Sequence, residues 1–134
     1  MPIFPSDEWV KEYVAKINSN EKYADAASDW EGDFLFIIED DSSKKPVASI
    51  YLDLYHGKCR SGKFLDKGDG EQAAFSYIGP YRNWVRLIKR EIDPIQGVLT
   101  GKFKLKGPMM KIMRYTRAAK ELVNTANQVE TEFK

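Results

Sequence analysis

The sequence predicts an α+β fold with a largely antiparallel sheet. Four segments with strand patterns follow one another between residues 34 and 78, helical patterns precede and follow them, and one more strand pattern occurs late in the chain. A run of strands kept apart from the helices is typical of α+β proteins, whereas α/β proteins alternate the two. The chain has 134 residues, the size of one domain, and no linker-like tract divides it, so we expect residues 1–134 to form a single domain.

The first expected element is a helix that begins after Ser6. Serine is a favourable N-cap, and two acidic residues follow it, where they suit the positive end of the helix dipole. The next apolar residues recur at helical spacing, at Trp9, Val10, Tyr13, Val14 and Ile17. The polar segment 18–20 ends this helix, and a second short helix is expected over residues 22–27.

Four strands are expected next, arranged as a meander. Their apolar residues alternate or run continuously, and polar turns containing Gly, Pro or Asp bound each segment. The strands are expected over residues 34–38, 48–54, 58–64 and 73–78, with turns over 40–46, 56–57 and 67–70.

The second half of the chain predicts helices around one strand. Pro80 suits a helix start, apolar residues then recur at helical spacing, and Asp93 caps a further turn of helix. Residues 102–106 alternate between lysine and apolar side chains, which predicts a strand with two different faces. Gly107 and Pro108 are expected to open one long last helix.

The segment from Asp93 to Met110 resembles the sterol carrier protein type-two family, the sterol-binding and sterol-transfer domains. It carries an Asp-Pro turn of helix, then the strand Gly101-Lys102-Phe103-Lys104-Leu105-Lys106-Gly107, then an apolar helix. The order of elements from Ser6 to about Ala126 fits as well. The resemblance implies a five-stranded sheet covered by helices on one face, with an internal apolar cavity between them that holds a sterol, fatty acid, acyl-CoA or phospholipid.

The resemblance also suggests which side chains contact the lipid. Three of the four methionines lie within residues 109–113, and flexible, polarisable methionine suits a wall that adapts to different ligands. The residues alone favour ordinary core packing for these methionines, and it is the resemblance that favours a lipid-contacting wall. The expected lipid-binding residues are Phe34, Phe36, Ile50, Trp84, Ile88, Phe103, Leu105, Met109, Met110 and Met113.

Positive charge is concentrated in one part of the chain. Residues 80–117 carry ten Lys and Arg against two acidic residues, whereas residues 1–79 carry nine against fifteen. This asymmetry suggests an anionic partner, and contact with an anionic head group or membrane is expected at Arg82, Arg86, Lys102, Lys104, Lys106 and Lys111. A solvated face that keeps an edge strand from aggregating is the open alternative. No nucleic-acid motif accompanies these charges.

The sequence favours a protein without catalytic residues, metal or cofactor. His56 is the only histidine and lies at a turn, and Cys59 is the only cysteine. A nucleophile needs a base and an oxyanion site as well, and one histidine with one cysteine is a poor zinc site. The acidic turns lack the ligand spacing of calcium loops.

These observations predict non-catalytic binding of a lipid, with intracellular transfer as its expected use. The sequence does not distinguish lipid transfer from a second use, in which the domain presents its bound lipid to an enzyme. The alternative is a protein-interaction module with a filled core and a basic face that meets an acidic partner. No secretory signal or apolar run of membrane length occurs, so the cytoplasm is the expected location.

Overall fold

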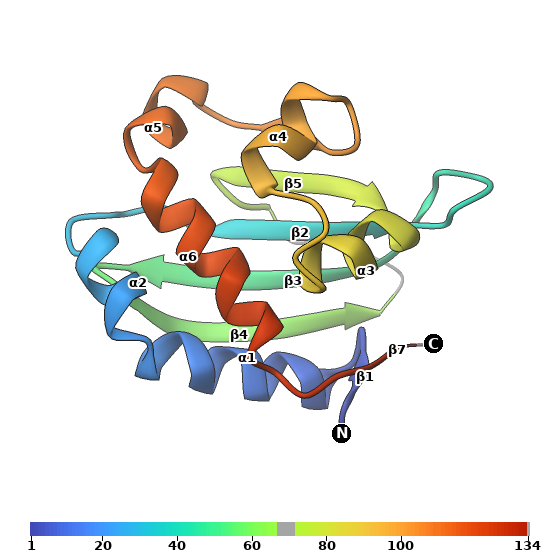
Figure 1. Cartoon of the computed structure of the whole chain (residues 1–134), viewed down its shortest axis with the longest axis horizontal. Coiled ribbons are helices and arrows are strands. Elements are labelled where there is room, and N and C mark those ends of the chain that lie inside the picture. Colours follow the sequence, from blue (N-terminus) through green and yellow to red (C-terminus); the bar gives the residue numbers. More distant parts are fainter. Residues whose placement is uncertain (67–71, 134) are drawn as a thin grey trace.

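A five-stranded sheet forms one layer of the molecule (Figure 1). The computed structural model describes residues 1–66 and 72–133. The strands lie in the order β4-β3-β2-β5-β6, and only the β2–β5 pair is parallel. The mainly antiparallel five-stranded sheet is therefore confirmed. The strands are β2 (Phe34–Glu39), β3 (Pro46–Tyr55), β4 (Lys58–Asp66), β5 (Phe75–Pro80) and β6 (Lys104–Lys106).

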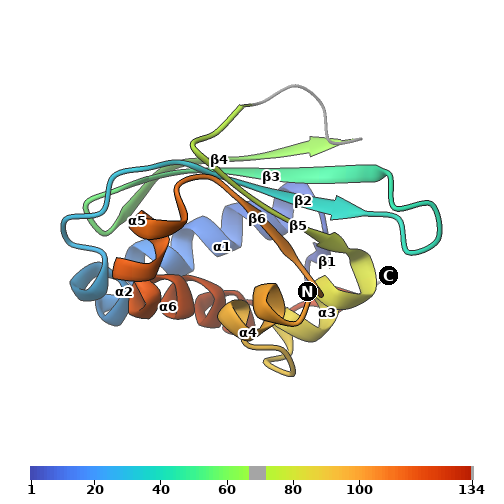
Figure 2. The same cartoon turned by 90° about the horizontal axis from the view of Figure 1, so that it is seen from above.

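The helices of the described residues all lie on one side of this sheet (Figure 2). They are α1 (Asp7–Ser19), α2 (Glu21–Ala26), α3 (Tyr81–Ile88), α4 (Pro94–Leu99), α5 (Met109–Arg114) and α6 (Thr116–Asn127). Two short strands, β1 (Ile3–Phe4) and β7 (Glu132–Phe133), pair in parallel and join the two ends of the described chain. Within residues 1–66 and 72–133, no helix combines the length and apolarity of a membrane span.

Helix α1 forms as the sequence predicts and packs against β4, the strand at one edge of the sheet. The hydroxyl of Ser6 accepts a hydrogen bond from the Trp9 N–H at 3.1 Å, which caps the helix. The predicted stripe is buried except for half-buried Val14. A β-carbon added to Gly62 of β4 would lie 2.5 Å from the Val14 side chain, so glycine is what permits this close approach.

The predicted meander is confirmed for β2, β3 and β4, which pair antiparallel in chain order, but it is wrong for β5. Strand β5 does not pair with β4 but lies on the far side of β2, where it runs parallel to that strand. Hydrophobic periodicity indicates which residues form strands but not which strands are neighbours. The chain crosses from β4, at one edge of the sheet, to β5 on the far side of β2, and no sequence pattern within either strand predicts this crossing. The expected turn over residues 67–70 lies outside the described residues.

The predicted single last helix is also wrong. Tyr115 has φ −117° and ψ 35°, outside the helical region, and separates α5 from α6. Its ring lies edge-on to Trp30 at 5.0 Å between centroids, a contact that favours the break. The apolar stripe continues through the break, since Ile112 and Ala118 on either side of it are both buried, so the spacing alone did not reveal two helices.

The predicted strand over residues 102–106 is shorter in the structure. The backbone N–H groups of Lys102 and Phe103 both donate to the carbonyl oxygen of Gly97, at 2.9 and 3.1 Å. These donors are therefore used in a turn that follows α4, and only residues 104–106 pair with β5.

Candidate functional site

Three apolar cavities lie in a row between the sheet and α6. Their volumes are about 20, 40 and 10 Å³. Phe34, Ile112 and Leu122 line both the first and the middle cavity. Phe36 and Val123 line both the middle and the third. Because neighbouring cavities share walls, the three form one interrupted space along α6.

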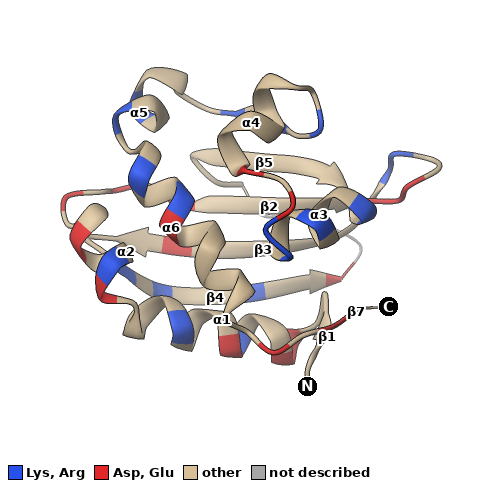
Figure 3. Ribbon diagram, in the orientation of Figure 1, with Lys and Arg blue, Asp and Glu red and all other residues tan. Residues whose placement is uncertain are grey.

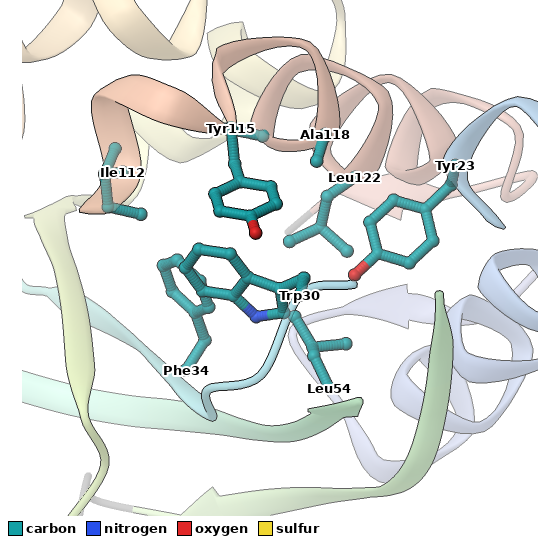
Figure 4. Close-up of a pocket in the computed structure, with 9 residues that line it drawn as sticks. Tyr23, Trp30, Phe34, Leu54, Ile112, Tyr115, Ala118 and Leu122 are labelled. Atoms are coloured by element: carbon teal, nitrogen blue, oxygen red, sulfur yellow. The ribbon is translucent and has the colours of Figure 1, made fainter. Parts of the chain in front are cut away.

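The first cavity lies beside the break between α5 and α6 (Figure 4). Trp30 stands between the sheet and the helices, and its indole N–H donates to the Gly32 carbonyl at 2.9 Å. Tyr115 points from the helix break toward this indole, and Tyr23 approaches from α2. The cavity wall thus combines four aromatic side chains with five aliphatic ones, and the indole N–H is already bonded.

The middle cavity is the largest of the three and lies under α4. Phe34, Phe36 and Tyr77 form its sheet side, while Ile95 and Val98 of α4 cover it. The Tyr77 hydroxyl donates to the Pro94 carbonyl at 2.6 Å. Burial raises the pKa of Tyr77, so this phenol stays neutral. The one hydroxyl at this wall is therefore satisfied within the protein.

The third cavity lies between α1, α3 and β3. Ile50, Trp84 and Ile88 are among its walls. The Trp84 indole N–H donates to the Ile37 carbonyl at 3.0 Å, which fixes α3 against β2. This end of the row is the most tightly filled.

The row is neither an open tunnel nor a solid core. Roughly 10–15 Å³ admits one water-sized molecule, so the present cavities hold a few such molecules at most. An acyl chain can enter only if the helices move away from the sheet. The fragmentation of this cover into α4, α5 and α6 means that no single long helix has to move as one body.

Six of the ten predicted lipid-binding residues line this row. Phe34, Phe36 and Leu105 line the middle cavity, and Phe36 also reaches the third. Ile50, Trp84 and Ile88 line the third cavity. Phe103 is buried outside the row: its ring stacks on Tyr77 at 4.6 Å between centroids.

The three predicted methionines lie on the surface instead. Met109, Met110 and Met113 are 44%, 75% and 55% exposed, and none of them lines the described cavities. The reason is that α5 has only six residues and buries one side chain, Ile112. Leu99 of α4 is also exposed, at 71%.

Several wall residues were not among the predicted ones. Ile112, Ala119 and Val123 recur at helical spacing in the last segment of the sequence, and that spacing was the signal that could have selected them. Trp30 and Tyr23 had no such signal, because they lie in a loop and a short helix and reach the cavity only through the fold.

The six predicted basic residues lie in three different places. Arg82, Arg86, Lys102 and Lys104 line one open groove of about 530 Å³. Lys111 instead turns inward: its ammonium group lies 4.9 Å above the Trp30 ring and donates to the Glu31 carbonyl oxygen. Lys106 is exposed on β6 and does not line the groove.

His56 and Cys59 do not form a reactive pair. His56 Nε2 lies 2.8 Å from Glu31 Oε2, and its ring stacks on Tyr55. Burial raises the pKa of the Cys59 thiol to about 12, and its Sγ donates to the Ser61 carbonyl at 3.3 Å. The thiol is therefore protonated at neutral pH and a poor nucleophile. Among the described residues, no group of three or more His, Cys, Asp or Glu could hold a metal ion.

Comparisons with known proteins agree on one family. No curated protein matches the chain. A crystal structure of sterol carrier protein 2 is 30% identical, covers 92% of this chain and 97% of its own, and gives a TM-score of 0.84. A solution structure of a protein from Thermus thermophilus, described as possibly a sterol carrier protein, is 29% identical over 95% and 90%, with a TM-score of 0.83.

A more distant protein shares the fold, the palmitated SCP2L2 of Aedes aegypti. It is 14% identical, with a TM-score of 0.52 over 87% of this chain and 89% of its own. A sequence model of the SCP-2 sterol transfer family matches residues 10–120. The chain therefore belongs to the SCP-2 sterol transfer family, whose domains bind and transfer lipids.

Proposed function

We propose that this protein, as a single domain, binds one lipid chain in the row of cavities beneath α6 and carries it without changing it chemically. The observation that carries the proposal is the shared lining of the three cavities, which places them side by side in one interrupted apolar row. Lipid sites are mostly apolar with few polar anchors, and the polar atoms of Trp30, Tyr77 and Trp84 are already bonded within the protein.

The energetics favour a long chain. Burial of ~12 methylenes at ~0.8 kcal/mol each offers roughly 10 kcal/mol. Part of this offsets the displacement of the covering helices, and the remainder is affinity. A fatty acid is the first ligand to test, because the Aedes aegypti protein that shares the fold is palmitated.

Two further features belong to the proposal. The basic residues attract an anionic head group or a membrane surface, where each cation near an anionic surface contributes about 1 kcal/mol. The cytoplasm is the proposed location, since the single cysteine Cys59 is a free thiol, in keeping with a reducing compartment.

A cavity-filling substitution tests the proposal. Ala119→Leu adds a side chain where the first and middle cavities meet, so we expect at least tenfold weaker fatty-acid binding by fluorescence displacement. Stability in urea should change by no more than about 1–2 kcal/mol. Ala15→Leu, at an exposed position of α1, is the matched control and should bind as the wild type does.

Native mass spectrometry of the purified protein gives the second readout, with one lipid per chain as the expected result. The small size of the cavities specifically favours one rival, the interaction module with a filled core. That rival gains support if no acyl chain or sterol binds and Ala119→Leu only stabilises the fold.

A further inference from the structure

The basic groove lies at the side of the molecule where three segments meet. These segments are the β2–β3 hairpin loop (residues 40–45), the start of α3 and the turn after α4 (residues 100–103). Figure 3 shows Lys and Arg on all three. With a volume of about 530 Å³, the groove is far larger than any of the apolar cavities and is open to solvent.

Hydrogen bonds hold the walls of the groove together. Asp41 of the hairpin accepts from the Arg82 N–H at 2.9 Å, which joins the hairpin to α3. The Asn83 side-chain amide donates to the Lys102 carbonyl at 3.0 Å, which joins α3 to the turn. Asp40 accepts from the Ser42 and Ser43 N–H groups and thereby shapes the hairpin loop. The groove is therefore preformed, so little free energy is lost in ordering its walls when a ligand binds.

The groove carries strong positive charge. Its lining residues include five cations, Lys44, Arg82, Arg86, Lys102 and Lys104, and one acidic residue, Glu39. The Asp41 carboxylate lies at the hairpin wall, where it accepts from the Arg82 N–H. Arg86 lies 3.6 Å from Glu91. Within the described residues, the other four cations make no ion pair within 4 Å. Because cations outnumber carboxylates in the lining, the cations repel one another, and an anion placed among them is held by several cations at once.

An aromatic pair separates this groove from the apolar row. Phe103 lines the groove, and Tyr77, on which it stacks, lines the middle cavity. Gly79 allows this arrangement, because a β-carbon there would lie 2.5 Å from the Phe103 ring. A charged site and an apolar site thus lie on opposite sides of one pair of rings.

We propose that the groove binds a phosphate group. Arginine donates to phosphate through two parallel N–H groups, and lysines add point charges around it. The phosphate is either free in solution or the head group of an amphiphile whose chain lies in the apolar row. The second source rests on the proposed function, whereas affinity for a free phosphate does not.

Titration with inorganic pyrophosphate, followed by amide NMR signals, tests the groove itself. We expect saturable shifts confined to residues 40–45, 79–86 and 101–104. The double variant Arg82→Gln/Lys102→Gln should bind at least tenfold more weakly. The matched control Lys16→Gln/Lys22→Gln, which removes two exposed cations from α1 and α2, should bind as the wild type does. Equal weakening in both variants, or shifts spread over all basic surfaces, overturns the proposal.

Two single-chain amphiphiles with the same acyl group distinguish the sources. Lysophosphatidic acid should bind about tenfold more tightly than the uncharged monoacylglycerol if head and chain are held together, and the groove variant should abolish that difference. Equal binding of the two, with pyrophosphate still bound, supports a site for free phosphate. If pyrophosphate binds and neither amphiphile does, the proposed lipid binding is contradicted and the phosphate groove is not. If the amphiphiles bind the groove variant as tightly as the wild type and pyrophosphate does not bind, the phosphate groove is contradicted and the proposed lipid binding is not.

Discussion

The interface of α1 with β4 and the cover formed by α4, α5 and α6 are built differently. At the first, Val10 and Ile17 are at most 1% exposed, and Gly62 admits Val14 at a distance that any larger residue would prevent. Neither valine nor Ile17 lines an apolar cavity. The second covers the row of cavities with three separate helices, two of them only six residues long, and leaves apolar side chains exposed. The contrast teaches that tight packing and unfilled apolar space lie at different interfaces of one fold, although Trp9 and Tyr13 of α1 also line the third cavity.

The sharpest test of this contrast is a pair of matched truncations. Ile17→Ala at the α1 interface should lower the free energy of unfolding by about 3 kcal/mol, because it opens a cavity among tightly packed atoms. Ile95→Ala in α4 should cost about 1 kcal/mol, since Ile95 is half-buried and already borders a cavity. Urea unfolding followed by circular dichroism measures both. Equal losses would show that the two regions are packed alike.

A smaller effect is expected from the Tyr13 hydroxyl. It donates to the Leu122 carbonyl at 2.7 Å and joins α1 to α6, so Tyr13→Phe should cost about 1 kcal/mol. Burial raises the pKa of Tyr13 well above its usual value, and burial likewise raises the pKa values of Tyr23 and Cys59.

These shifts also give a pH dependence with a definite sign. A raised pKa means that the folded state keeps the proton, so this stability is complete at neutral pH. It is lost as the pH rises above the values of the unfolded chain, at about 1.4 kcal/mol per pH unit and per group. Urea midpoints at pH 8, 10 and 11 should therefore fall steeply above pH 10, and less steeply in Tyr13→Phe. If the urea midpoint of Tyr13→Phe falls as steeply with pH as that of the wild type, Tyr13 does not contribute to the pH dependence.

The smallest effect concerns the attachment of α5. Lys111→Gln removes the ammonium group from the Trp30 ring, which should cost about 0.5 kcal/mol. Because α5 covers the first cavity, we expect faster fatty-acid association in stopped-flow measurements. Lys106→Gln, on exposed β6, is the control. Identical association rates in the two variants would mean that α5 does not limit entry.

What the sequence could predict depended on whether the signal was local. Ser6 and the stripe from Trp9 to Ile17 predicted α1 correctly, because capping and spacing are properties of one segment. The position of β5 beside β2 could not be predicted from spacing, since strand order is decided by packing between distant segments. The break at Tyr115 had the same origin, because Trp30, 85 residues earlier, supplies the contact.

The candidate site divides in the same way. Phe34 and Phe36 could be predicted as wall residues, because they alternate on one face of a strand. The methionines could not be placed, because a helix as short as α5 turns only one side chain inward, and apolar composition does not say which. The convergence of Arg82 with Lys102 followed from the positions of α3 and the turn after α4, although their charges were evident in the sequence.

The pairing of β1 with β7 has a practical consequence. The Glu132 N–H donates to the Pro2 carbonyl at 2.9 Å, and the two ends leave the molecule at the same corner, away from α5 (Figure 1). A surface tether or affinity tag attached at either end would therefore orient the molecule in the same way. In both arrangements the methionine-bearing helix would face outward, accessible to a vesicle or a partner in solution.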